Sequence, residues 1–259
     1  MEGHGTLKIF FNVLVHQNNN VVEDLVNNIF KFTENPVICL HVNKSFADFD
    51  SKRFERIENL YINPQSFSHG KYESKVKAFC SNHDFVLENK VDFDYEMIFY
   101  SQMLFVKQGI EKYLMDCDSC MIDTKLDCSS HNFNSKESEL FDGKIYKSLV
   151  EGLVFNFEVS KKIYSLIKNS SLYEKTGWCT EEFVFPSAIN KFSSQVKRVP
   201  TNTQKRPQFT IEDVKKIIHN EVKEISSFYY GKQSVDEIYI IHRVDYNYEN
   251  PIRKYLRSL

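Results

Sequence analysis

Short apolar runs alternate with helix-like stretches along the first hundred residues, and this alternation constrains the fold more than any other feature of the sequence. The apolar runs of strand length are residues 7–15, 37–42, 60–62 and 95–100. Between them, apolar residues recur at helical spacing, as in residues 21–32. Strands separated by such crossovers pair in parallel, with right-handed connections. The expected fold class is α/β, with a mostly parallel central sheet flanked by helices.

Shorter elements are expected along the rest of the chain. We expect helices over residues 51–58, 71–88, 159–167 and 211–225, strands over 153–157 and 237–242, and a terminal helix from Pro251. Thr210 and Asp213 have the spacing of a capping box. Residues 116–143 lack periodicity and are rich in Ser, Asp, Asn and Lys, so we expect an excursion loop there. Because no linker or repeat divides the chain, a single domain over residues 1–259 is expected.

Composition and charge argue against several classes of function. The formal net charge of −2 provides no field that favours nucleic acid or an anionic membrane. Glycines number only 8, and no G-x-G-x-x-G or P-loop motif occurs, which argues against dehydrogenases and P-loop enzymes.

No apolar stretch approaches the roughly 18 residues of a membrane span. The opening run is interrupted by Lys8 and Asn12 and lacks a basic leader, so it is interpreted as a strand. A cytoplasmic protein is expected, with peripheral contact at the inner face of the cell membrane left open.

One cysteine-rich segment has the spacing of a metal site. Cys117, Cys120, Cys128 and His131 follow the pattern C-x2-C-x7-C-x2-H, which suits a structural zinc ion. The short middle spacing and the polar, loop-like segment also suit free, reduced thiols. A zinc-stabilised interaction module is therefore one alternative.

Residues that follow predicted strands are the candidate ligand contacts, because ligands of open α/β sheets bind beyond the carboxyl ends of the strands. His16, Asn43 and the segment from Ser101 and Gln102 to Leu104 have this placement. Two Asp-x-Asp pairs have a spacing that holds a divalent ion in some enzymes, and they are Asp92 with Asp94 and Asp48 with Asp50. Both pairs lie before or away from a strand end, so polar turns are the alternative interpretation.

Several segments, taken in order, also carry a resemblance. They are Val15-His16-Gln17-Asn18, Leu40-His41-Val42-Asn43-Lys44-Ser45, Ser74-Lys75-Val76-Lys77-Ala78, Phe93 through Gln102, and Cys179-Thr180-Glu181-Glu182-Phe183-Val184-Phe185. Together they resemble the core-2/I-branching β-1,6-N-acetylglucosaminyltransferase family and its bacterial relatives from surface-polysaccharide clusters. The matching family segments read His-Lys-Asn-Pro, a strand ending in Asp-Lys, Ser-Leu-Val-x-Ala, Ser-Gly-Gln-Asp and Ser-Pro-Asp-Glu-aromatic. Asn43 and Met103 stand where the family has Asp.

The resemblance implies a GT-A-type fold and an inverting reaction that needs no metal. Residues 1–115 would form the nucleotide-sugar-binding half, and residues 144–259 the acceptor and catalytic half. Glu182 would be the catalytic base, and Glu181 takes the place of the family's Asp. Adjacent acids are also common in the first turn of a helix, where the helix dipole favours them, so helix capping is the alternative for this pair.

Positive charge is concentrated in the last third of the chain. A leaving nucleoside diphosphate needs fixed cations if no metal stabilises its charge. No acid occurs between Glu182 and Glu212. The candidate cations are Arg243, Arg253, Lys254, Lys205 and Arg206. Arginine binds phosphate through a planar fork, and Arg243 ranks first because it ends a predicted strand. A solvated basic surface is the alternative.

The sequence therefore predicts a glycosyltransferase of hexosyl or N-acetylhexosaminyl type. It would move a sugar from a nucleotide-sugar donor to a hydroxyl of a cell-surface polysaccharide or lipid-linked saccharide. No cofactor and no nucleic-acid partner are expected, and a divalent metal is an alternative to the fixed cations. The missing acids at Asn43 and Met103 leave a second hypothesis, a non-catalytic α/β binding or assembly subunit of a polysaccharide-synthesis complex.

Overall fold

A seven-stranded sheet organises the protein, as seen in a computed structural model that describes residues 6–16, 18–68, 74–121, 125–126, 133–177, 179–203, 209–222, 224–227, 231–234 and 237–259. The strand order is β10-β6-β9-β4-β1-β2-β3. These strands are β1 (Ile9–Val15), β2 (Pro36–Val42), β3 (Leu60–Ile62), β4 (Tyr95–Tyr100), β6 (Ser119–Cys120), β9 (Val154–Asn156) and β10 (Val196–Lys197). Pairing is parallel except at β9, which runs antiparallel to β4 and β6. The predicted α/β class with a mostly parallel central sheet is confirmed.

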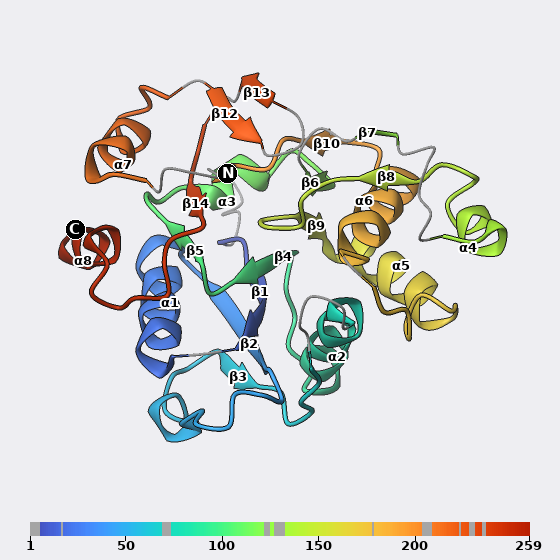
Figure 1. Ribbon diagram of the computed structural model, residues 1–259, viewed down its shortest axis with the longest axis horizontal. Coiled ribbons are helices and arrows are strands. Elements are labelled where there is room, and N and C mark those ends of the chain that lie inside the picture. Colours follow the sequence, from blue (N-terminus) through green and yellow to red (C-terminus); the bar gives the residue numbers. More distant parts are fainter. Residues whose placement is uncertain are drawn as a thin grey trace.

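Helices cover both faces of this sheet (Figure 1). On one side lie α1 (Asn19–Phe32) and α8 (Pro251–Ser258), and on the other lie α2 (Lys75–Glu88), α5 (Phe157–Lys168) and α6 (Glu181–Phe192). Asn18, Ser74 and Asn156 each cap a helix by accepting a backbone N–H of its first turn. Every residue of β1 is buried, as expected for a parallel strand covered on both faces.

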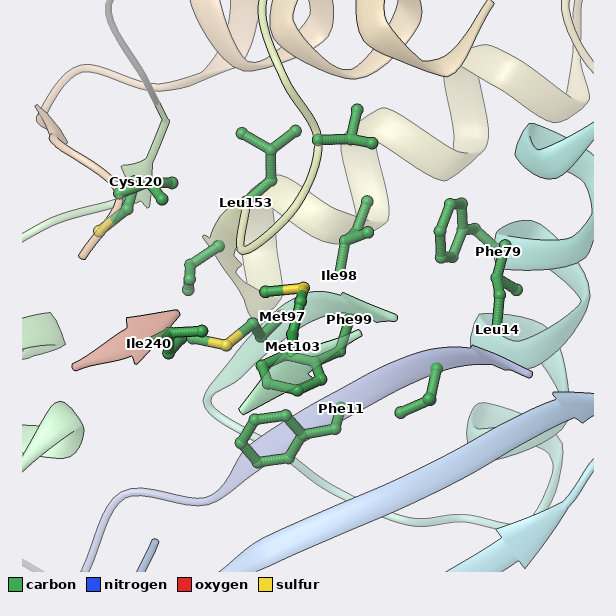
Figure 2. Close-up of a cluster of buried hydrophobic side chains, with 14 of the residues drawn as sticks. Phe11, Leu14, Phe79, Met97, Ile98, Phe99, Met103, Cys120, Leu153 and Ile240 are labelled. Carbon is green, nitrogen blue, oxygen red and sulfur yellow. The ribbon is translucent and has the colours of Figure 1, made fainter. Parts of the chain in front are cut away.

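A second, three-stranded sheet packs beside the end of β4. Its order is β11 (Thr201–Thr203), β14 (Ile240–His242) and β5 (Met103–Phe105). In the hydrophobic core, the rings of Phe11 and Phe99 pack edge to face, with centroids 5.6 Å apart (Figure 2). Because His242 pairs with Met103, the carboxyl end of β14 lies next to the carboxyl end of β4.

Some short elements differ from the sequence predictions. The expected helix over residues 51–58 is only a 3-10 turn, η1 (Ser51–Arg53). The expected excursion loop contributes β6 to the central sheet and also contains β7 (Lys125–Leu126) and α4 (Ser135–Glu139). The helix α7 (Ile211–Ile218) ends earlier than predicted, and β12 (Glu224–Ser227) pairs with β13 (Gly231–Ser234). The remaining elements are α3 (Ile110–Leu114) and β8 (Tyr146–Lys147). Elements of two to five residues are too short for periodicity to show.

Two other predictions concern helices. Thr210 and Asp213 form the predicted capping box at the start of α7, each side chain accepting the other's backbone N–H. Within the described ranges, no helix combines the length and the apolar character needed to cross a bilayer.

The candidate residues Lys205, Arg206, Cys128 and His131 lie outside the described residues.

Candidate active site

The start of α6 places the two predicted catalytic glutamates, and a proline inside the helix fixes its surroundings. Pro186 has no N–H, so the carbonyl of Glu182, four residues earlier, lacks its regular helical hydrogen bond. The backbone N–H of Ser148 donates to this carbonyl instead, at 2.9 Å. The segment that follows β8 is therefore tied to the start of α6. Cys179, just before the helix, has a φ of 58°, a left-handed conformation that few non-glycine residues adopt.

The Glu182 carboxyl is buried among other acids. Its residue is only 7% exposed, and its Oε2 atom has no hydrogen-bond partner. Burial, followed by the nearby carboxylates of Glu151 and Glu181, raises the pKa of Glu182 to about 7. A general base is most effective when its pKa lies near the working pH. The position predicted from the sequence is therefore a buried carboxyl whose pKa is raised to about 7.

Lys75 joins three elements at this point, although sequence reasoning did not identify it as a site residue. It is the first residue of α2, and its Nζ atom lies 2.5 Å from Oε1 of buried Glu181. The same ammonium lies 5.9 Å from the centroid of the Tyr100 ring, at the end of β4. The hydroxyl of Tyr100 is buried without a hydrogen-bond partner, and burial together with the surrounding carboxylates raises its pKa. The starts of α2 and α6 thus meet at the carboxyl end of the central sheet.

Glu151 is a further acid of the cluster, and no signal in the sequence marks it, because it is a single acid in an irregular segment. Its Oε1 atom lies 3.8 Å from Nε2 of His242, and its Oε2 atom has no hydrogen-bond partner. The next residue, Gly152, has a φ of +83°, and a Cβ atom there would lie 2.3 Å from Oγ1 of Thr201. The chain therefore passes so close to β11 that a side chain at residue 152 would clash with Thr201, which glycine avoids.

Arg243 lies where the sequence predicted it, directly after β14. The N–H of Val244 donates to the carbonyl of Gln102 at 3.0 Å, so Arg243 lies beside the residues that follow β4. Its φ is 73°, and because such a conformation costs about 1–3 kcal/mol, it persists only where the surrounding structure imposes it. Burial lowers the pKa of the adjacent His242, with a smaller contribution in the same direction from Arg243.

The other residues predicted to contact a ligand also lie directly after strands. His16 follows β1, and its ring meets that of Tyr246 edge to face, with centroids 4.9 Å apart. Burial and the charge of Lys75 lower the pKa of His16. Ser101 is buried directly after β4. Asn43 differs, because its side-chain oxygen accepts from the N–H and the hydroxyl of Ser45, at 2.9 and 2.8 Å, and so forms a local turn.

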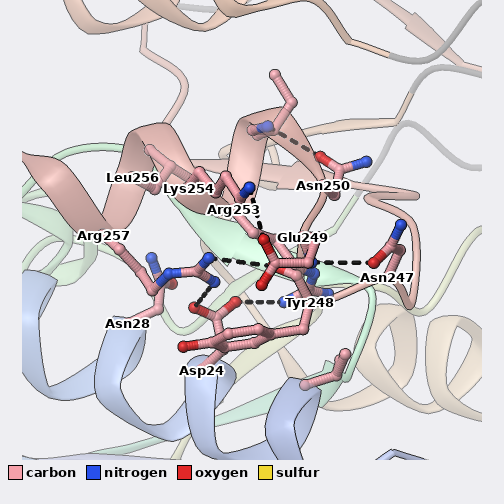
Figure 3. Close-up of polar contacts among 12 residues, drawn as sticks. Asp24, Asn28, Asn247, Tyr248, Glu249, Asn250, Arg253, Lys254, Leu256 and Arg257 are labelled. Atoms are coloured by element: carbon pink, nitrogen blue, oxygen red, sulfur yellow. Dashed lines mark hydrogen bonds and ion pairs between the residues drawn. The ribbon is translucent and has the colours of Figure 1, made fainter.

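Two residues predicted to contact the donor instead pair with other residues of the protein (Figure 3). Arg253 is 0% exposed, and its guanidinium nitrogens donate to Asp24 Oδ2 at 2.7 Å, to the carbonyl of Ser101 at 2.9 Å and to the carbonyl of Asp245 at 2.9 Å. These bonds anchor α8 to α1 and to the end of β4, so we assign Arg253 this anchoring role in place of the predicted donor contact. Lys254 forms an exposed ion pair with Glu249 at 2.5 Å.

The candidate metal ligands lie apart from this cluster or partly outside the described residues. Asp94 Oδ2 accepts from the N–H of Lys8 at 2.7 Å, at the edge where β1 and β4 begin, so Asp92 and Asp94 lie at the opposite end of the sheet from Glu182. The Sγ atoms of Cys117 and Cys120 lie 3.5 Å apart. Over the described ranges, no three His, Cys, Asp or Glu side chains are grouped to hold a metal ion. The zinc hypothesis stays a prediction because its other two ligands are not described.

Comparisons with known proteins give distant likenesses. No protein-family model matches the sequence, and neither does any curated protein sequence. The apo structure of the bifunctional glycosyltransferase WbbM overlays 100% of this chain and 52% of its own, with 11% identity and a TM-score of 0.46. The apo form of the glycosyltransferase GlyE from Streptococcus pneumoniae TIGR4 overlays 98% of this chain and 59% of its own, with 10% identity and a TM-score of 0.42. An active-site mutant of LgtC overlays 97% of this chain and 95% of its own, with 9% identity and a TM-score of 0.46. The chain thus spans about half the length of WbbM.

Proposed function

We propose that this chain is an inverting glycosyltransferase in which Glu182 is the general base. The observation that carries this proposal is the Glu182 carboxyl, which is buried at the carboxyl end of a parallel sheet with one oxygen unpartnered and a pKa raised to about 7. A carboxylate of this kind accepts a proton from a sugar hydroxyl near neutral pH. Its position also suits the rule that ligands of open α/β sheets bind beyond the strand ends.

The reaction needs one proton acceptor and one stabilised leaving group. The hydroxyl oxygen of the acceptor attacks the anomeric carbon of the donor while its proton moves to Glu182. The bond from the anomeric carbon to the diphosphate oxygen breaks, and its electron pair leaves with the nucleoside diphosphate. Single displacement from the opposite face inverts the configuration at that carbon. Fixed charges that face the leaving diphosphate are already oriented before the reaction, so they stabilise it without reorganisation.

Arg243 is the proposed contact to the diphosphate, because it lies beside Gln102 and its left-handed backbone is held by the surrounding structure. His16 and the residues Ser101 and Gln102 are proposed to contact the donor, and Lys205 and Arg206 to add positive charge. This arrangement needs no metal ion. The donor would carry a hexosyl or N-acetylhexosaminyl group. The acceptor would be a surface polysaccharide or a lipid-linked saccharide, reached in the cytoplasm or at the inner face of the membrane.

A panel of sugar nucleotides tests this proposal. A donor that binds the native state raises its melting temperature, and the donor so identified is then used for transfer assays. Replacing Glu182 with Gln is expected to lower turnover by at least 10²-fold while the donor-induced thermal shift is retained. Glu158→Gln, on the exposed side of α5, is the matched control and should leave turnover unchanged. Undiminished turnover in Glu182→Gln would remove this residue from the mechanism.

Metal dependence has its own test. Turnover is expected to persist in EDTA, since the proposed diphosphate contacts are side-chain cations. Complete loss of turnover in EDTA, with recovery on addition of Mn²⁺, would overturn the metal-independent mechanism.

A second candidate function is favoured by Met103 and Asn43. Met103 is fully buried in β5, where the resembled family has an acid, and the Asn43 side chain is engaged in its own turn. A non-catalytic binding or assembly subunit would tolerate both features. It predicts that the isolated protein binds a saccharide or a partner transferase but transfers no sugar from any donor of the panel. Transfer that depends on Glu182 would exclude this alternative.

A further inference from the structure

Two cysteines of the segment that follows α3 lie in contact with each other. The Sγ atoms of Cys117 and Cys120 are 3.5 Å apart, and both residues are free thiols. A disulfide bond is about 2.05 Å long, so the two sulfur atoms need to approach by only about 1.5 Å to become bonded. Cys117 is 5% exposed and Cys120 is 0% exposed, so the pair is almost completely enclosed by protein.

The backbone around this pair is fixed by neighbouring elements. The hydroxyl of Tyr95, at the start of β4, donates to the carbonyl of Cys117 at 2.8 Å. Cys120 belongs to β6, which pairs with β9 on one side and with β10 on the other. Between the two cysteines, the Asp118 carboxylate accepts from the N–H and the hydroxyl of Ser194, at 2.9 and 2.7 Å. The turn that brings the sulfur atoms together is therefore held from several sides.

We propose that Cys117 and Cys120 are a redox-active dithiol that closes to an intramolecular disulfide when the protein meets a peroxide. Cys117, the more exposed of the pair, reacts first: its sulfur takes one oxygen from the peroxide to form a sulfenic acid, and water is released. The sulfur of Cys120 then attacks the sulfur of Cys117, and the S–O bond breaks. The hydroxyl leaves with the thiol proton of Cys120 as a second water. Both thiols are thereby oxidised and one peroxide is reduced.

Contact between the sulfur atoms decides where this oxidation stops. A sulfenic acid without a neighbouring thiol persists or is oxidised further to sulfinic acid, which is irreversible in most proteins. Here the thiol of Cys120 already lies beside Cys117, so its attack needs no encounter step. A small dithiol reductant reverses the bridge by thiol–disulfide exchange. We therefore expect a reversible bridge, and this chemistry does not depend on the proposed function.

Peptide mapping of the full chain tests the proposal. The folded protein is treated with hydrogen peroxide, its remaining thiols are alkylated after denaturation, and trypsin then cleaves it. One tryptic peptide, residues 113–125, carries both cysteines, whereas Cys128 falls in the next peptide. This peptide should escape alkylation, weigh two hydrogen atoms less than its reduced form, and be alkylated at both cysteines after reduction with dithiothreitol. Cys39 and Cys80, each 0% exposed in the core, should be alkylated throughout.

Two variants show which sulfur atoms take part. In Cys120→Ser no bridge can form, so the sulfenic acid of Cys117 should be trapped by dimedone. Cys128→Ser is the matched control and should leave the bridge unchanged. The proposal fails if both cysteines of the wild-type peptide are still alkylated after peroxide treatment, or if either is bonded to Cys128. It also fails if the purified protein holds zinc that protects both thiols until a chelator is added.

Discussion

Replacing Glu182 with Gln should stabilise the protein at alkaline pH, because the wild-type side chain must be buried as an anion there. Glutamine resembles the protonated, neutral form of glutamate in shape and in charge. At pH 4.5 most of the native protein carries a neutral Glu182, so the variant and the wild type should then have similar free energies of unfolding. At pH 8 the wild type buries a carboxylate beside Glu151, and the variant does not.

The size of this effect follows from the raised pKa. A shift from 4.5 to about 7 is about 2.5 pH units, and each unit corresponds to about 1.36 kcal/mol, so the difference is about 3 kcal/mol. The native state binds a proton that the unfolded chain releases between these two values, so wild-type stability falls as the pH rises through this window. The stabilising contribution of Glu182 is therefore complete below pH 4.5 and lost above pH 7.

Urea unfolding followed by circular dichroism at several pH values between 4.5 and 8 measures this difference. Other ionisable groups contribute equally to both proteins, so their contribution cancels when the two curves are subtracted. Glu158→Gln is the control, since its side chain is 67% exposed and should give a difference near zero at every pH. If the gap between Glu182→Gln and the wild type is the same at pH 4.5 and pH 8, the side chain is not a buried carboxyl with a raised pKa, and the reasoning fails.

Three further predictions concern other parts of the structure. Asp24→Asn leaves the buried guanidinium of Arg253 without its counter-ion and should lower the free energy of unfolding by about 3–5 kcal/mol. Lys254→Ala, at an exposed ion pair, should change it by less than about 0.5 kcal/mol, and equal effects of the two variants in urea unfolding would contradict the assignment of Arg253 as an anchor. Gly152→Ala should destabilise the fold by about 1–3 kcal/mol more than Gly143→Ala, because both have a positive φ but only Gly152 faces Thr201 at contact distance. Arg243→Ala should weaken sugar-nucleotide binding about tenfold in titration calorimetry, as expected for loss of a charge-assisted hydrogen bond, and unaltered affinity would remove Arg243 from the donor site.

Features that depend on local sequence were predictable. The strands β1 and β4 and the helices α1 and α2 follow from hydrophobic spacing, and the capping box of α7 follows from Thr210 and Asp213. Glu182 was selected as a candidate because an acidic pair opens a helix and because its segment resembles a known one; its catalytic role stays a prediction. Each of these signals lies within a window of about twenty residues, over which periodicity and capping act.

Contacts between distant segments were not predictable in the same way. The sequence around Arg253 indicates an exposed basic helix, but its counter-ion, Asp24, lies 229 residues earlier in the chain, and nothing near either residue announces the pairing. Lys75 has the sequence context of an ordinary helix-surface lysine, and its partner Glu181 lies 106 residues away. A local pattern reports which side chains an element presents, whereas the partner depends on how the elements pack.

The candidate site illustrates why a candidate residue can be selected from the sequence while its environment cannot be predicted. Pro186 removes one hydrogen bond from α6, and the N–H of Ser148 replaces it, so the segment that contains Glu151 is drawn toward Glu182. Gly152 then allows this segment to pass close to Thr201, next to Glu151, whose carboxyl lies 3.8 Å from His242. Neither residue has a chemical role in proton transfer. Both nevertheless shape the surroundings in which burial, and to a smaller extent the charge of Glu151, raises the pKa of Glu182 toward neutrality.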